Sequence, residues 1–151
     1  MNQKIGYFLC LSGLLLIHST ILFAEKTPPD LFLTSKVEDN SFFATALKNK
    51  SDKSYFENIK IQYLIEAIRV SPLTFIRNND PHEGKKAASH LSWKYLHALG
   101  KVKTPQDFIE NIASQSTQTG QPYLVKNAGG ETYPLKDVLY NELRRLEQAL
   151  L

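Results

Sequence analysis

Cysteine is almost absent from this sequence of 151 residues, which contains one, Cys10. Cys10 lies in an apolar run near the N-terminus, so a chain from which that run is cleaved would contain no cysteine. Disulfide bonds, thiolate nucleophiles and cysteine-bound zinc are excluded from such a chain. Its fold then has to rest on an apolar core alone, and the 127 residues that follow residue 24 are enough to build one.

The sequence also lacks a large excess of either positive or negative charge. The sequence has 18 Lys and Arg against 15 Asp and Glu, a formal net charge of +3. This charge is too small to indicate a nucleic-acid partner, and we expect none. With 42% hydrophobic and 22% charged residues, the composition is that of a single globular domain.

The sequence also lacks the short motifs of well-known catalytic sites. It has no phosphate loop, dinucleotide fingerprint, His-Glu-x-x-His or Gly-x-Ser-x-Gly. His90 and His97 are seven residues apart, which on a helix separates them by about 10 Å, too far for one metal ion bound at about 2 Å. We therefore expect no cofactor and no metal site.

A long hydrophobic run is present at the N-terminus. Lys4 precedes the nearly unbroken apolar residues 5–23, a pattern typical of a signal peptide, here residues 1–24 with cleavage after Ala24. The alternative is an uncleaved anchor formed by residues 5–23, which approach the roughly 20 needed to span a bilayer. Both interpretations predict export, to the periplasm or medium in the first case and to the outer face of the inner membrane in the second. Contact with the membrane is expected only if the segment is uncleaved.

Residues 25–53 have scattered charges and no sustained hydrophobic period. They are interpreted as a flexible N-terminal linker that docks locally through two short apolar patches, Leu31-Phe32-Leu33 and Phe42-Phe43-Ala44. Residues 54–151 are then expected to form a single small globular domain.

Helical periodicity within that domain predicts four helices, near residues 55–69, 84–99, 105–115 and 136–149. Ser54 and Glu57 have the spacing of a capping box for the first helix, and Thr104 with Asp107 has a similar spacing for the third. The segment Asp80-Pro81-His82-Glu83 resembles a helix start with proline in the first turn, which leaves the start of the second helix open.

Short β-prone segments are predicted near residues 74–77 and 122–133, the latter as a hairpin. Two parts of the chain share the order strand, turn, helix, which indicates a weak internal repeat. Two such ribbons could pair into one small sheet with the helices on one face. The predicted fold class is α+β, mainly helical, with about four helices and one or two short β-hairpins forming a small antiparallel sheet.

The chemistry-bearing residues of this domain are expected to form a polar seam beside the core. They combine hydrogen-bond donors, acceptors and one imidazole, a group that titrates near neutrality. The residues of this seam are Arg77, Asn78, His90, Lys94, Ser114, Ser116 and Tyr123. His90 and Lys94 are four apart and share a helix face.

Two functions fit this seam. The absence of a catalytic signature favours a noncatalytic binding or interaction module whose partner is an envelope protein, a peptide or a small anion. In that case Ser114 and Ser116 satisfy backbone groups at a helix end. The alternative is a small periplasmic enzyme, a hydrolase in which His90 or Lys94 activates the hydroxyl of Ser114 or Ser116 while Arg77 holds an anion.

Six separated motifs also resemble the YfeK-like bacterial periplasmic proteins, a family of unknown function. The resemblance covers about residues 59–143 and lies in Ile59 with Leu64, Phe75-Ile76-Arg77-Asn78, Ala87 with His90-Leu91 and Lys94-Tyr95, Thr104 with Phe108-Ile109, Ile112-Ala113-Ser114 with Ser116, and Gly120-Gln121-Pro122-Tyr123 with Val125. It implies a bacterial envelope protein of the same fold and brings no catalytic residue with it.

Export is the first testable prediction. Because Lys4 and residues 5–23 form a signal-like segment, cell fractionation should place the chain outside the cytosol, and N-terminal sequencing should begin at Glu25. Recovery of an intact Met1 in the membrane would replace cleavage by the anchor. Recovery of an intact Met1 in the cytosol would contradict export.

Overall fold

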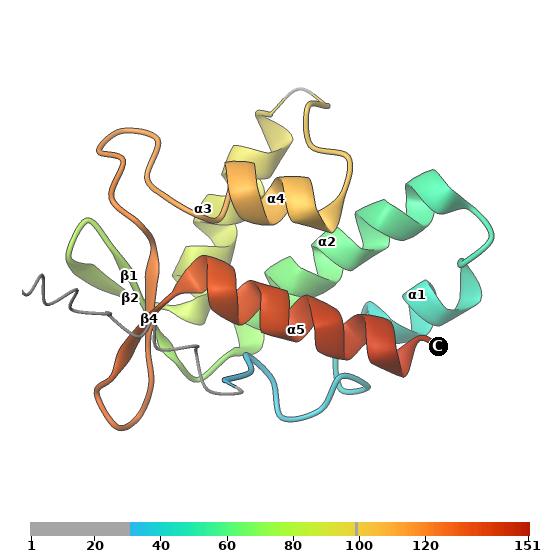
Figure 1. Ribbon diagram of the computed structural model, residues 1–151, viewed down its shortest axis with the longest axis horizontal. Coiled ribbons are helices and arrows are strands. Elements are labelled where there is room, and N and C mark those ends of the chain that lie inside the picture. Colours follow the sequence, from blue (N-terminus) through green and yellow to red (C-terminus); the bar gives the residue numbers. More distant parts are fainter. Residues whose placement is uncertain (1–30, 99) are drawn as a thin grey trace, which may run out of the picture.

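The computed structural model describes residues 31–98 and 100–151 (Figure 1). The predicted signal peptide, its cleavage site and the anchor alternative lie outside these residues. The described elements are, in chain order, α1 (Phe43–Lys48), α2 (Lys53–Val70), β1 (Thr74–Arg77), β2 (Asp80–Glu83), α3 (Gly84–Leu96), α4 (Pro105–Asn111), β3 (Leu124–Lys126), β4 (Thr132–Pro134) and α5 (Leu135–Ala149).

The four strands form one antiparallel sheet in the order β2-β1-β3-β4. In Figure 1 the sheet lies at one end of the molecule, and α5 runs from β4 back along the other helices. The two ribbons of the expected repeat therefore pair with each other, through β1 and β3, with Phe75 opposite Val125. Helix exceeds strand, and the predicted α+β class with a small antiparallel sheet is confirmed.

The segment Asp80–Glu83 is a strand, so its interpretation as a helix start is wrong. Asn78 and Asn79 have φ angles of 52° and 68°, which are those of a two-residue type I′ hairpin turn. This turn returns the chain antiparallel to β1, and the backbone pairing outweighs the local preference of Pro81 for a helix start. Pro81 is tolerated because β2 is an edge strand.

Helix α2 is the central helix of the core and packs against α1, α3, α4 and α5. Its fully enclosed side chains include Ile61, Tyr63 and Leu64. The predicted cap is wrong, because Asp52 rather than Ser54 accepts the hydrogen bond from the backbone N–H of Tyr55, at 3.1 Å. The helix therefore begins one residue before Ser54, and the Ser54–Glu57 capping box does not form.

The described part of the predicted linker packs on the domain and includes helix α1, which sequence periodicity missed because six residues are too few to show one. Leu33 is buried, and its backbone N–H donates to the carboxylate of Glu142 at 3.0 Å. The hydroxyls of Thr34 and Tyr63 also donate to Glu142, and Arg145 pairs with it at 2.7 Å. This fully buried carboxylate ties the N-terminal segment to α2 and α5.

Helix α5 matches the prediction to within one residue, whereas α3 and α4 end earlier than predicted. The capping box of Thr104 and Asp107 is present at the start of α4. Helix α4 ends at Asn111 rather than near residue 115, because the chain turns there toward the bridge between Gln115 and Pro122. Helix α3 ends at Leu96 rather than near residue 99.

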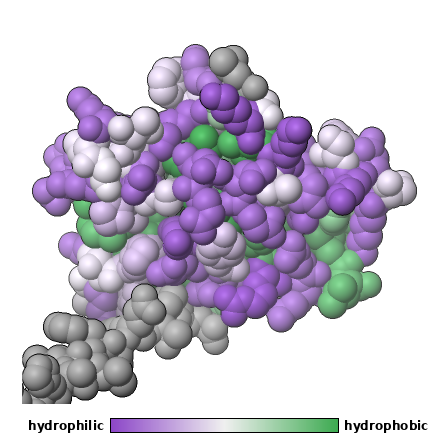
Figure 2. All heavy atoms as spheres, turned by 45° about the horizontal axis from the view of Figure 1, so that its top comes forward, coloured by the Kyte–Doolittle hydropathy of each residue, from purple (hydrophilic) through white to green (hydrophobic). Residues whose placement is uncertain are grey.

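The helices of the described ranges include none that is long and apolar enough to cross a membrane. Figure 2 shows that hydrophilic side chains cover most of the face in view, with hydrophobic side chains in separate patches. The apolar surface of the helices is thus largely used in the core.

The close approach of α3 to the end of α2 gives a prediction about stability. A Cβ atom at Gly84 would overlap the carbonyl oxygen of Ile68 and lie 3.0 Å from that of Ser71. We expect Gly84→Ala to lower the free energy of unfolding by about 2 kcal/mol or more, measured by denaturant unfolding. Gly129→Ala is the matched control, because its Cβ would meet only the Asn127 side chain, at 3.3 Å. An equal loss in both variants would contradict the steric explanation.

Candidate functional site

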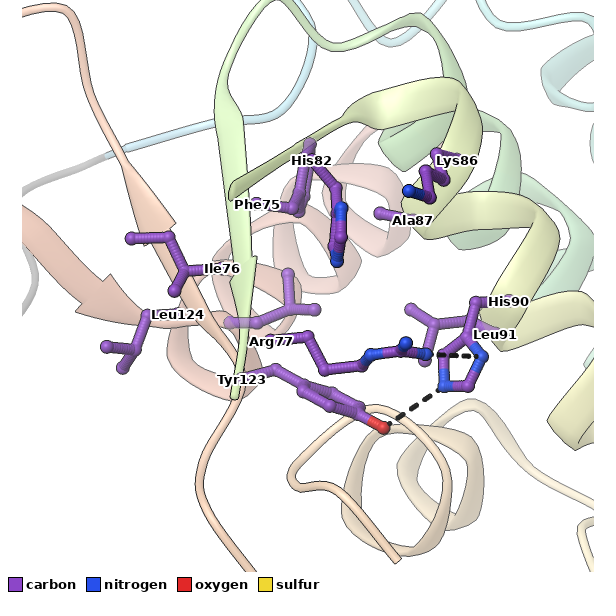
Figure 3. Close-up of a pocket in the computed structure, with 11 residues that line it drawn as sticks. Phe75, Ile76, Arg77, His82, Lys86, Ala87, His90, Leu91, Tyr123 and Leu124 are labelled. Atoms are coloured by element: carbon purple, nitrogen blue, oxygen red, sulfur yellow. Dashed lines mark hydrogen bonds between the residues drawn. The ribbon is translucent and has the colours of Figure 1, made fainter. Parts of the chain in front are cut away.

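A pocket of about 210 Å³ lies between the sheet and α3 (Figure 3). Its walls come from β1, β2, α3, the start of β3 with the residue before it, and the start of α5. The lining residues are Phe75, Ile76, Arg77, His82, Lys86, Ala87, His90, Leu91, Tyr123, Leu124 and Leu135. One part of the wall is apolar, and the other carries hydrogen-bond donors and positive charge.

The strand and helix periods explain how these side chains meet. Phe75 and Arg77 are two apart on β1 and therefore lie on the same face of the sheet. Ala87, Leu91 and Lys94 recur at the spacing of one helix face, which His90 shares. Tyr123 is held beside β1 by its backbone, because its N–H donates to the carbonyl of Ser114 and its carbonyl accepts from the N–H of Leu135.

Arg77, His90 and Tyr123 form a chain of hydrogen bonds at the polar wall. Nη1 of Arg77 donates to Nδ1 of His90 at 2.9 Å, and Nε2 of His90 lies 3.3 Å from the hydroxyl of Tyr123. Because a guanidinium only donates, Nδ1 is the acceptor and the neutral ring carries its proton on Nε2. Nε2 therefore donates to the Tyr123 oxygen, which leaves the Tyr123 O–H to donate elsewhere.

Lys94, on α3, also contacts this group and links it to the end of α4. Its Nζ donates to the carbonyls of Ile112 and Gln115, at 2.6 and 3.0 Å, and to the Tyr123 hydroxyl at 3.4 Å. It also lies 5.1 Å from the centre of the Tyr123 ring. Lys94 thus satisfies carbonyls beyond the end of α4 and fixes the position of Tyr123.

The electrostatics of the pocket disfavour additional positive charge. Burial, followed by the charges of Arg77, Lys94 and His82, lowers the pKa of His90 below its ordinary value. Burial and then Arg77 lower the pKa of Lys94, and burial and then the charges of Lys86 and Arg77 lower that of His82. No carboxylate is present among the described residues that line the pocket. The site is therefore suited to a ligand that brings negative charge.

Other members of the predicted seam lie apart from the imidazole. The Ser114 hydroxyl donates to the carbonyl of Glu110 at 2.6 Å, and the Ser116 hydroxyl accepts from the N–H of Thr119 at 3.4 Å. Asn78 is in the hairpin turn, and its side chain accepts from the Thr119 hydroxyl. The structure thus joins Arg77, His90, Lys94 and Tyr123 by hydrogen bonds, whereas the two serines satisfy the backbone locally.

Sequence reasoning missed His82 and Lys86 as members of the pocket wall. A two-residue turn at Asn78-Asn79 fixes His82 opposite Phe75, so counting the hairpin register would have placed it there. Lys86 precedes His90 by four residues and shares its helix face. The apolar wall, by contrast, could not be predicted from local sequence patterns, because Leu135 is distant in sequence from the other residues of that wall.

The fold and the site define a class of protein: a small α+β domain with a positively charged and partly apolar pocket between its sheet and a helix. The model of a family of unknown function, DUF5329, matches residues 56–147, more than half of the chain, and the chain belongs to this family.

A relative described as the uncharacterised protein YfeK of Salmonella typhimurium is 38% identical over 68 residues, which are 44% of this chain and 57% of the relative. The match thus spans little more than half of the relative's length. The resemblance to YfeK-like proteins of unknown function is confirmed. No solved structure matches the chain.

The lowered pKa of His90 predicts a pH dependence of stability. The folded state resists protonation of this ring, so its stabilising contribution is complete above the ordinary pKa of 6.5 and is lost as the pH falls through the lower, folded-state pKa. Between about pH 8 and about pH 5, the free energy of unfolding should therefore fall less in His90→Gln than in the native chain. His97→Gln, an exposed control at the residue that follows α3, should keep the native pH dependence. Equal slopes for the native chain and His90→Gln would contradict the prediction.

Proposed function

We propose that this protein is an exported, noncatalytic binding module of the bacterial envelope, and that its pocket binds a small organic anion with an apolar group. One observation carries the proposal: Arg77, His90 and Tyr123 bring donors and positive charge to an apolar pocket in which no described lining residue is acidic. Structural charges are usually paired, so an unneutralised cation in a pocket indicates an anionic ligand.

The pocket wall supports a ligand with two chemically different ends. Phe75, Leu91 and Leu135 are buried apolar residues that would contact a hydrocarbon group. Arg77 and the free Tyr123 O–H would contact an oxyanion such as a carboxylate. A volume of about 210 Å³ is below the roughly 300–1,000 Å³ of sites for drug-sized ligands, which favours a small molecule or a single side chain.

The hydrogen bonds support binding rather than hydrolysis. Both ring nitrogens of His90 are engaged, by Arg77 and by Tyr123. Neither Ser114 nor Ser116 is hydrogen-bonded to this ring, whereas a serine nucleophile needs a base within hydrogen-bond reach. Export is supported by Lys4 and the apolar run of residues 5–23.

Binding should be tested with benzoate, a carboxylate on a small apolar ring, by calorimetry on the full-length chain. We expect a Kd on the order of 1 mM and much weaker binding of acetate, which lacks the ring, and of benzyl alcohol, which lacks the charge. Arg77→Gln should weaken benzoate binding by about ten-fold or more, because a charge-assisted hydrogen bond is lost.

Arg69→Gln is the matched control for this experiment. Arg69 is also half-buried, but it is paired with Glu66 on α2 and does not line this pocket. An equal effect of both substitutions, or equal binding of benzoate and benzyl alcohol, would contradict the proposed site. Ester hydrolysis by the native chain that is abolished by Ser114→Ala or Ser116→Ala would instead establish the hydrolase alternative.

A further inference from the structure

The pocket between the sheet and α3 has a second polar end, which the proposed function leaves unused. His82 from β2 and Lys86 from α3 line this end. Figure 3 shows them at the top of the pocket, with the His82 imidazole pointing into it. The end already described, with Arg77, His90 and Tyr123, lies at the bottom of the same view. One pocket therefore presents polar groups at two opposite ends.

The side chains of the second end are available to a ligand. Within the described part of the chain, neither the ring nitrogens of His82 nor Nζ of Lys86 have a hydrogen-bond or ion-pair partner. Lys86 is exposed and His82 is half-buried, so a molecule in the pocket can reach both. A neutral imidazole offers one N–H group and an ammonium offers three. This end can therefore donate hydrogen bonds to an oxyanion.

The charges of the pocket wall match a ligand with two negative charges. Arg77 and Lys86 are cations at opposite ends, and the described lining residues include no carboxylate. Burial, and then the charges of Lys86 and Arg77, lowers the pKa of His82, so the field of both cations reaches this ring. Asp80 acts on His82 in the opposite direction, but it does not line the pocket. In the described ranges it forms no ion pair with either cation.

The strand and helix periods set the distance between the two ends. His82 lies opposite Phe75 in the hairpin, and Phe75 is two residues from Arg77, which is about 7 Å along a strand. Lys86 precedes His90 by four residues, which is about 6 Å along a helix. The sheet side and the helix side of the pocket therefore agree on a separation of about 6–7 Å.

An apolar surface lies between the two ends. Phe75 and Leu91 are buried and Ala87 is half-buried, and all three line the pocket. The pocket volume of about 210 Å³ exceeds the roughly 150 Å³ of a cavity that binds benzene. The pocket therefore has room for one ring, or a short hydrocarbon chain, that carries a small polar group at each end.

We propose that the ligand of this pocket is a dianion in which a short apolar spacer separates two oxyanion groups, as in a dicarboxylate. The proposal rests on the proposed function, because it assigns the second end of the same site. One oxyanion accepts from Arg77 and the Tyr123 O–H, and the other accepts from His82 and Lys86. His82 and Lys86 are thus the residues that select a dianion over a monoanion with the same spacer.

Calorimetry on the full-length chain tests the proposal with three ligands that share one ring. Terephthalate has carboxylates at opposite ends of the ring, phthalate has them side by side, and benzoate has one. The titrations are made at constant ionic strength and about pH 7.5, where all of these carboxyl groups are ionised. We expect terephthalate to bind at least about five-fold more tightly than benzoate, because a second charge-assisted contact forms. Phthalate, which has the same charge but the wrong spacing, should not show this gain.

A matched pair of substitutions tests the second end directly. Lys86→Gln should reduce the ratio of terephthalate affinity to benzoate affinity to about one. Lys85→Gln removes the same charge from the neighbouring residue, which is exposed and does not line this pocket, and should keep the native ratio.

The outcomes separate this proposal from the one on which it rests. If benzoate binds but terephthalate binds no more tightly, the second end is not a binding site and the proposed anion site remains. Equal gains for terephthalate and phthalate, or equal effects of the two substitutions, would overturn the proposal in favour of a general attraction between charges. If none of the three ligands binds, both proposals are wrong.

Discussion

The antiparallel pairing of β1 with β3 is the interaction on which the site depends. It joins two hairpins, β1–β2 and β3–β4, into one sheet with Phe75 opposite Val125. Continuing the register by one residue beyond the last strand pair places Arg77 opposite Tyr123, on the same face as Phe75. Helix α3 follows directly after β2, so His90 reaches both. A shift of the register by one residue would separate Arg77 from Tyr123, and the two side chains would no longer form one wall of the pocket.

The two halves of the molecule repeat a hairpin followed by a helix, but equivalent positions in the two helices carry different residues with different surroundings. Leu91 and Glu142 each follow the start of their helix by seven residues. Leu91 lines the open pocket, whereas Glu142 is covered by the N-terminal segment through Leu33 and Thr34. A buried carboxylate needs donors, which this segment supplies, while an apolar leucine needs none and leaves its surroundings free for a ligand.

Charge compensation separates the structural polar groups from the candidate functional ones. Glu142 is fully buried and accepts from four groups, including Arg145, so its charge is satisfied inside the fold. Arg77, by contrast, donates to a neutral imidazole and has no carboxylate beside it among the described pocket residues. Lys94 stands between these cases, because backbone carbonyls rather than a carboxylate hold it. The proposed site therefore differs from the structural polar groups in carrying positive charge without an adjacent carboxylate, and not in burial alone.

Local patterns in the sequence predicted the four main helices, the capping box at Thr104 and the candidacy of Arg77, His90, Lys94 and Tyr123. These features depend on residues a few positions apart, for which helix and strand periods are sufficient. The same patterns were misleading at two places: Ser54 was predicted as the cap of α2, where Asp52 forms it, and Asp80–Glu83 resembled a helix start, where a strand forms.

Only the tertiary structure decided that Arg77, His90 and Tyr123 meet, that Ser114 and Ser116 do not join them, and that the N-terminal segment covers Glu142. The physical reason is that burial and hydrogen bonding between distant segments depend on which faces pack together. That packing sets which donors are desolvated and which charges are compensated. Residue type and spacing identify the candidate side chains, but the packing of the helices and strands determines whether these side chains lie close enough to interact.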